Sequence, residues 1–260
     1  MRRNKKIGEW AAFILGIGLI LALIQAGNAL QGRRPVFPSA EQTVRAFFEL
    51  LSRKETYAEI GTTLAHAVKA IALSALIGTV MGLGEGLIPY LHALLRPLHA
   101  LLRSMPMILL AMVMLMATRF SKEWMPVLTG CMVLVPMISE AGYEGCTRID
   151  RELIDVYRLD SRTSPRIILR VYLPMMSGYM KQAFVNACGM GLKVIVTAEY
   201  LVHTMRSLGQ AVYLKLDALG YEEVFAYALI MALLVLVLTG IPALIVRIVN
   251  RQKKEEVTTG

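Results

Sequence analysis

Residues 148–174 read RIDRELIDVYRLDSRTSPRIILRVYLP, a polar, arginine-rich segment between two strongly apolar stretches. In a chain this hydrophobic the segment must lie in water, and its positive charge predicts the cytoplasmic side of a membrane. Asp150 is a suitable cap for a short helix that ends near Asp160, with Glu152 in the first turn, where the helix dipole favours an anion. A large basic loop between membrane spans is a suitable docking surface for a cytoplasmic partner.

A second helix is predicted directly after this one. Ser164 is a capping hydroxyl, and Pro165 follows at the first helical position, where proline loses no hydrogen bond. The pattern therefore predicts a helix, a short turn and a second helix that leads into the next apolar run. Pro174 removes a backbone donor near the start of that run and is expected to bend it.

The rest of the chain is unusually apolar. Of its 260 residues 56% are hydrophobic, whereas soluble domains are about 45–50% apolar. A transmembrane helix needs about 20 mostly apolar residues. The sequence has six such runs, at about 7–30, 64–88, 91–117, 125–143, 171–203 and 224–249. We therefore predict an all-α membrane protein with about six spans.

The charge distribution predicts the topology. With the amino and carboxyl termini in the cytoplasm, more lysines and arginines lie on the cytoplasmic side than outside. This placement explains the net charge of +9 without a nucleic-acid partner. Cys131, Cys146 and Cys188 form no C-x-x-C or Cys/His cluster, so neither a disulfide framework nor a metal site is indicated.

Three regions follow from this pattern. Residues 1–56 hold an amino-terminal span and then, from Ser39, a helix with apolar spacing that is expected to lie on the outer membrane surface. A cleaved signal peptide, with 27–29 as its cleavage site, is the alternative interpretation of the first apolar run. Residues 57–250 form the core, with the polar segment at 148–170, and residues 251–260 form a cytoplasmic tail.

The polar segment resembles a motif of one transporter family. Importer permeases of the ATP-binding cassette (ABC) class carry a cytoplasmic E-A-A-x3-G-x9-I-x-L-P pattern. Here Asp155-Val156-Tyr157 stand at the E-A-A positions, Asp160 replaces the glycine, and Val171-Tyr172-Leu173-Pro174 end the motif after one extra residue. The order and spacing of further residues are similar to the nitrate/sulfonate/taurine/bicarbonate branch: Pro97, Arg103-Ser-Met-Pro106, Ala198-Glu199 and Ser207-Leu208-Gly209-Gln210.

This resemblance implies a type I ABC importer fold with a cytoplasmic coupling helix between spans four and five. The coupling residues that it implies are Asp150, Glu152, Asp155, Val156, Tyr157, Arg158, Leu159, Asp160, Arg162, Leu173 and Pro174. It also implies two permease copies as a homodimer, two cytoplasmic ATPases, a periplasmic or lipid-anchored substrate-binding protein and a multi-pass location in a bacterial inner membrane. The arginines have a second interpretation, contact with lipid headgroups.

ATP and Mg²⁺ are expected on the partner ATPase, because this chain has no G-x-x-x-x-G-K-[ST] phosphate loop. We expect no cofactor in the chain itself. Neither a Ser/His/Asp set nor H-E-x-x-H appears, so no catalytic residue is predicted and a membrane enzyme is disfavoured. An ATPase-independent secondary transporter or channel remains the alternative, although the two halves of the chain show no convincing repeat.

Ionisable residues inside spans are costly and usually face protein or water. Lys193 and Glu199 are therefore candidates for the translocation pathway, and Met107 and Met112 are candidate lining residues because flexible thioethers adapt to what they contact. Lys193 would attract an anionic solute, whereas Glu199 would pair with a neighbouring span. The alternative is that both residues form structural ion pairs. The two project to different faces, because six residues turn a helix by about 600°.

Gly78, Gly82 and Gly86 recur at four-residue spacing in the second run. Small residues let helices approach closely in lipid. Packing within one subunit and a seam between two copies are both compatible with this row, and the first is favoured. The solute itself is not identified by the sequence: nitrate, a sulfonate, taurine, bicarbonate or a heterocyclic vitamin precursor all fit this branch.

Overall fold

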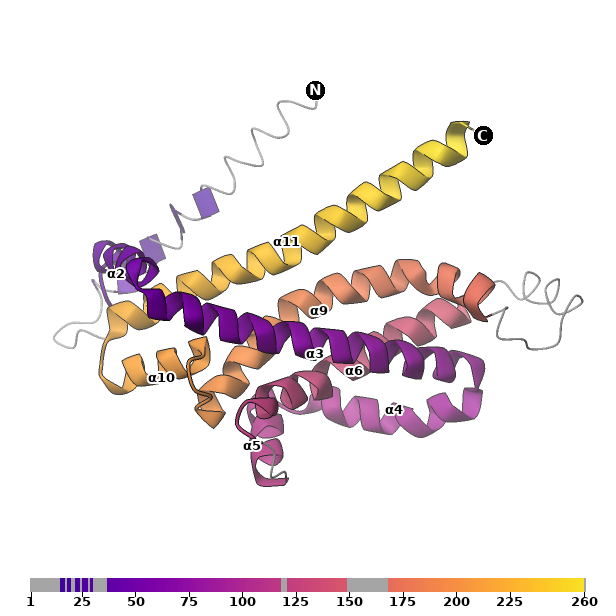
Figure 1. Cartoon of the computed structure of the whole chain (residues 1–260), viewed down its shortest axis with the longest axis horizontal. Helices are drawn as coiled ribbons and strands as arrows, with labels where there is room; N and C mark the ends of the chain where they lie inside the picture. Colours follow the sequence, from indigo (N-terminus) through magenta and orange to yellow (C-terminus); the bar gives the residue numbers. More distant parts are fainter. Residues whose placement is uncertain are drawn as a thin grey trace, which may run out of the picture.

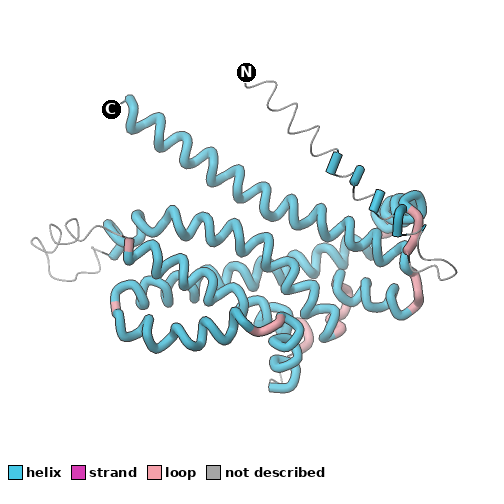
Figure 2. Tube along the Cα trace, turned by 180° about the vertical axis from the view of Figure 1, so that it is seen from behind, coloured by secondary structure: helices cyan, strands magenta, loops and turns pink. Residues whose placement is uncertain are grey.

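The computed structural model describes residues 37–117, 121–148 and 168–259, together with isolated residues between 15 and 29. In these ranges every regular element is helical, and Figure 2 shows the helices joined by short loops. The all-α fold predicted from hydropathy is confirmed for this part of the chain. Most of the first predicted span lies outside the described residues.

Three long helices form the centre of the bundle: α3 (Lys54–Leu87), α6 (Trp124–Thr147) and α9 (Leu173–Val202) lie side by side (Figure 1). A methyl group added at Gly82 of α3 would lie 2.4 Å from the carbonyl oxygen of Ser139 in α6. One added at Gly78 would lie 2.8 Å from Cβ of Ile138, and one at Gly86 2.3 Å from Cβ of Cys146. The glycine row therefore lies at the α3–α6 contact within one chain and lets the two backbones approach closely.

The run at 91–117, predicted as one span, consists of two helices. α4 (Pro89–Ser104) and α5 (Met107–Ala117) meet at an angle of 106°. Pro106 follows the break, and proline restricts the residue before it to extended conformations. Met105 has φ −70° and ψ 132°, so the helix ends there. Residues 91–117 taken together are apolar enough for one span in spite of Arg103 and Ser104 at the break, which is why hydropathy alone did not reveal it.

A short helix, α2 (Ala40–Ser52), precedes α3. Ser39 caps it: its side chain accepts from the backbone N–H of Gln42, whose side chain in turn accepts from the Ser39 backbone, a capping box. Leu50 is buried against α11, whereas Phe48 is 63% exposed. The helix thus has one face on the protein and one free apolar face.

A turn of π-helix, η1 (Ile168–Tyr172), precedes α9. Pro174 stands in the first turn of α9 and has no N–H to donate to the preceding turn. We attribute the irregular turn to this missing donor, since π turns and prolines are common causes of helix distortion. The irregularity lies where the sequence predicted a bend.

Two helices complete the fold, α10 (Leu208–Asp217) and α11 (Tyr221–Thr259). The carboxyl-terminal half of α11 runs away from the other helices (Figure 1). Only 6% of the most apolar 18-residue stretch of α11 is buried. Among the described residues four helices, α3, α6, α9 and α11, are long and apolar enough to cross a membrane, and the bent α4–α5 pair is a fifth candidate. These five correspond to the second to sixth predicted runs.

Candidate functional site

The predicted coupling segment begins and ends at one end of the bundle, which we call the loop end. The Cys146 Sγ atom near the end of α6 lies 3.9 Å from Sδ of Met176 in α9. The Arg148 guanidinium lies 5.8 Å from the centroid of the Tyr179 ring. Leu173 and Pro174 are exposed here, in the first turn of α9. The other predicted coupling residues lie outside the described residues: Asp150, Glu152, Asp155, Val156, Tyr157, Arg158, Leu159, Asp160 and Arg162.

Glu199 lies toward the opposite end of the bundle and is fully buried. Its carboxylate accepts a hydrogen bond of 2.8 Å from Thr63 Oγ1 and contacts His66 Nδ1 at 2.7 Å. The backbone N–H of Gly209 donates to it at 3.4 Å. Thr63 Oγ1 also accepts from the backbone N–H of Leu208 at 3.0 Å. One buried carboxylate thus joins α3, α9 and the start of α10.

The close approach of α10 to α9 depends on a glycine. A methyl group added at Gly209 would lie 2.5 Å from both the Glu199 Cβ and the Tyr200 backbone nitrogen. Ser207 caps α10 by accepting from the backbone N–H of Gln210. The cap and the glycine bring the first turn of α10, with its free N–H groups, onto the carboxylate.

A second buried carboxylate, Glu85 of α3, lies near the loop end. Ser139 Oγ donates to it at 2.5 Å, and His92 Nδ1 of α4 lies 3.0 Å away. The His92 ring stacks on Tyr143 of α6, with ring centroids 3.7 Å apart. His99 is also buried, and its Nε2 lies 3.8 Å from the Glu85 carboxylate. Thr63 and Glu85 are 22 residues apart on α3, so the two clusters are separated by about 33 Å.

Lys193 lies on an open groove between α9 and α11. The groove has a volume of about 550 Å³ and is lined mostly by apolar side chains, with Thr197 as its other polar member. Lys193 is exposed, whereas Glu199 is buried on another side of α9. The structure therefore places these two predicted pathway residues apart, as their spacing indicated.

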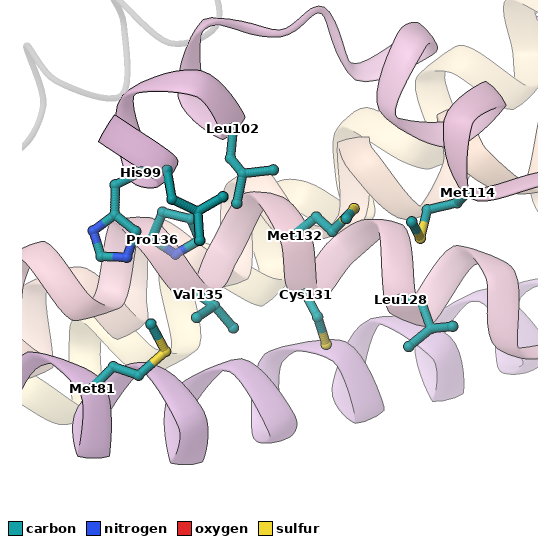
Figure 3. Close-up of a pocket in the computed structure, with 10 residues that line it drawn as sticks. Met81, His99, Leu102, Met114, Leu128, Cys131, Met132, Val135 and Pro136 are labelled. Atoms are coloured by element: carbon teal, nitrogen blue, oxygen red, sulfur yellow. The ribbon is translucent and has the colours of Figure 1, made fainter. Parts of the chain in front are cut away.

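The methionine-rich helices enclose a different space. A pocket of about 300 Å³ lies between α3, α4, α5 and α6, with Met81, Met114, Met132 and Cys131 on its wall (Figure 3). The two methionines singled out from the sequence lie elsewhere: Met107 packs against the Leu110 cluster, and Met112 is 47% exposed.

The site is thus a set of polar groups distributed through an apolar bundle. In the described ranges no cluster of three or more His, Cys, Asp or Glu side chains is arranged to hold a metal ion. Two fully buried carboxylates each hold helices together at one end, and a lysine lies on a groove between them. Such intramembrane charges are typical of proteins whose spans move against one another or line a polar path.

Residues 74–255 match the family described as binding-protein-dependent transport system inner membrane component. The chain belongs to this family. The match begins at Ser74 in α3 and includes α4, α5, α6, α9, α10 and nearly all of α11. It therefore covers Glu85, Lys193 and Glu199 of this permease. Among curated proteins none is significantly similar in sequence.

Several solved ABC transporters share the fold of the permease. The MetNI methionine ABC transporter in inward-facing conformations aligns with a TM-score of 0.60 and 19% identity, over 74% of this chain and 96% of that chain. A bacterial ABC transporter involved in the import of the acidic polysaccharide alginate aligns with a TM-score of 0.65 and 15% identity, over 95% of this chain and 99% of that one. A second alginate transporter structure is in complex with a periplasmic protein bound to an alginate pentasaccharide. It aligns with a TM-score of 0.62 and 15% identity, over 92% of this chain and 94% of that one. The permease therefore has the type I ABC importer fold.

The cluster around Glu85 was not predicted from the sequence. A signal was present in the spacing, because His92, Arg96, His99 and Arg103 follow one another at intervals of four, three and four residues. These intervals place four basic side chains on one face of a helix.

Proposed function

We propose that this permease is the membrane-spanning subunit of an ATP-driven importer that moves a small, anionic solute into a bacterial cell by alternating access. The single observation that carries the coupling part of the proposal is the location of the two ends of the 148–170 segment. Both are packed together at the loop end by the contact of Cys146 with Met176. A movement of the segment would therefore reach α6 and α9 together, as a rigid-body switch requires.

The proposed assembly has two copies of this chain, two cytoplasmic ATPases that bind ATP and Mg²⁺, and a periplasmic or lipid-anchored binding protein that selects the solute. The termini and the loop end are proposed to face the cytoplasm, in agreement with the distribution of lysine and arginine. The solute class of the nitrate/sulfonate/taurine/bicarbonate branch is proposed from the sequence resemblance, with a heterocyclic vitamin precursor as the alternative.

The ATPase contact is testable by crosslinking from the coupling segment. A photoreactive phenylalanine analogue in place of Tyr157 is expected to crosslink to a copurified ATPase on illumination, because the segment is proposed to seat in that subunit. The same analogue in place of Tyr57 is the control. Tyr57 is 59% exposed in the first turn of α3, far from the loop end.

Crosslinks from position 157 that never reach an ATPase, while the complex still copurifies, would contradict the coupling role. Copurification without an ATPase would instead favour an autonomous transporter or channel. Equal crosslinking from positions 57 and 157 would show that the reagent does not discriminate between the two ends of the bundle.

Lys193 is the proposed attraction point for the solute, since it is a cation on an intramembrane groove. Lys193→Met should reduce uptake of an anionic solute at least about tenfold, the effect of losing roughly 1.4 kcal/mol of attraction, while assembly and ATP hydrolysis stay unchanged. Uptake would be measured in proteoliposomes with the solute that the cognate binding protein retains. Lys69→Met is the matched control, because Lys69 is an exposed lysine of α3 that lies over the Trp124 ring. Unchanged uptake by Lys193→Met would show that Lys193 is structural.

A further inference from the structure

One part of the contact between α4 and the rest of the bundle is polar, whereas Leu102 packs against an apolar cluster and lines the pocket of Figure 3. In the polar part, the basic residues of α4 face acidic side chains of α3 and α6 across a cavity of about 330 Å³. We call this contact the polar seam. Its charged and histidine members are His92, Arg96, His99 and Arg103 of α4, Glu85 of α3, and Glu140 and Glu144 of α6.

The polar seam is held at both ends of α4. At the start of α4, His92 contacts the buried Glu85 carboxylate and stacks on Tyr143. At the end of α4, Arg103 forms an ion pair with Glu140. The Arg103 and Glu140 side chains are 52% and 44% exposed, so water reaches one end of the seam while Glu85 closes the other.

The polar seam differs physically from the neighbouring α3–α6 contact. There, Gly82 and Gly142 bring two backbones together, and any sliding would force atoms into one another or open a void. At the open end of the polar seam, the half-exposed Arg103 and Glu140 side chains gain water when they lose each other, because exposed ion pairs exchange readily with solvent. Separation of α4 from α6 at this end therefore costs less than separation of α3 from α6.

The polar seam also connects two parts of the permease that are otherwise far apart. Glu140, Tyr143 and Glu144 lie on the last two turns of α6, which ends at Thr147 where the coupling segment begins. On the other side, Arg103 lies in the last turn of α4, directly before the bend into α5. A displacement of the end of α6 would thus change the position of α4 and of the bend.

We propose that the polar seam is the joint through which the coupling segment moves α4, opening it from α3 and α6 during the ATP cycle. Glu85, His92, Arg103 and Glu140 are its positioning residues. His99 Nε2 is buried without a hydrogen-bond partner, and it becomes solvated when the seam opens. This inference rests on the proposed function, because the movement is driven by the partner ATPase.

The movement is measurable as a distance between spin labels in the complete complex in lipid nanodiscs. Encoded spin-label amino acids replace Ala93 on the exposed side of α4 and Thr147 at the end of α6, so that the three cysteines, including Cys146 with its contact to Met176, are kept. The 93–147 distance is expected to change by on the order of 5 Å, one helical turn, between the nucleotide-free and the ADP-vanadate states. A control pair at Val80 of α3 and Thr147 should not change, since the glycine contact holds these helices together.

A second measurement uses the exchange of charges at the Arg103–Glu140 pair. Arg103→Glu alone should broaden the nucleotide-free 93–147 distance distribution and raise ATP hydrolysis without binding protein about threefold, the effect of losing one half-exposed ion pair. The double variant Arg103→Glu with Glu140→Arg should restore both values. Arg45→Glu, which breaks the exposed Arg45–Glu49 pair of α2, is the matched control and should change neither.

The two proposals fail in different ways. A complex that assembles and hydrolyses ATP with the same 93–147 distance in both nucleotide states would overturn the polar seam as a joint and leave the permease function intact. A double charge-exchange variant whose 93–147 distance distribution stays as broad as that of Arg103→Glu alone would also overturn the polar seam as a joint. A chain that never assembles with an ATPase would overturn the proposed function and this inference together.

Discussion

Gly82→Ala should lower the free energy of unfolding by about 2 kcal/mol, within the range for overpacking a tight contact. The added methyl group would lie 2.4 Å from the Ser139 carbonyl oxygen and 2.9 Å from Cα of Gly142. Both neighbours are backbone atoms, so no side chain rotates away to relieve the clash, and α3 must shift from α6. We expect a fall of roughly 5 °C in the midpoint of thermal unfolding in detergent, measured as the loss of monodisperse chain in size-exclusion chromatography.

Gly61→Ala is the matched control in the same helix. No atom outside the local helix lies within 4 Å of a methyl group at this position. Alanine is also the better helix former by about 1 kcal/mol, so the control variant should be as stable as the parent chain or slightly more so. Equal midpoints for the two variants would mean that α3 and α6 are not in close contact at Gly82.

The helices and the presence of one close helix contact could be predicted from the sequence, because the residues that specify them are close together in the chain. Ser39 and Gln42 stand three residues apart, which is enough to specify the capping box that starts α2. The glycine row at positions 78, 82 and 86 repeats at the spacing of one helix face, so a close helix contact followed from the spacing alone. Which helix it contacts did not follow, because the partner α6 begins about forty residues later.

The bend between α4 and α5 shows where hydropathy stops being informative. Residues 91–117 are apolar enough for one span, and the structure nevertheless turns by 106° within them. Pro106 was visible in the sequence, but a proline in a membrane helix often causes only a kink. A kink and a break differ in the contacts around the proline, which here include the ion pair of Arg103 with Glu140 of α6 just before the bend, and these contacts join residues far apart in the sequence.

The polar groups show the same limit. The positions of Lys193 and Glu199 on different faces of α9 followed from their six-residue spacing. The partners of Glu199 did not, since Thr63 and His66 lie more than 130 residues earlier in the chain. Glu85 is a stronger case: it is one of three acidic residues in α3, and its burial follows only when His92 and Ser139 are brought to it by two other helices.

Glu199→Ala should lower the free energy of unfolding by about 3 kcal/mol or more, the cost of removing one member of a buried polar pair. The substitution leaves His66 Nδ1, Thr63 Oγ1 and the Gly209 N–H without their common acceptor in a site that water does not reach. It would be measured by the same thermal assay as Gly82→Ala. Glu49→Ala is the control, because Glu49 is a half-exposed carboxylate that pairs with Arg45 one turn earlier in α2.

Two further variants separate the role of the carboxylate from its volume. Glu199→Gln keeps the shape and one acceptor oxygen, so its effect should be smaller than that of Glu199→Ala. The combination of Glu199→Ala with His66→Ala should cost less than the sum of the single changes by about 1 kcal/mol or more, since the histidine is then no longer buried without a partner. Strict additivity would show that the two residues act independently. If Glu199→Ala kept full stability but stopped transport, the carboxylate would act on the solute path and not as the fastening between α3, α9 and α10.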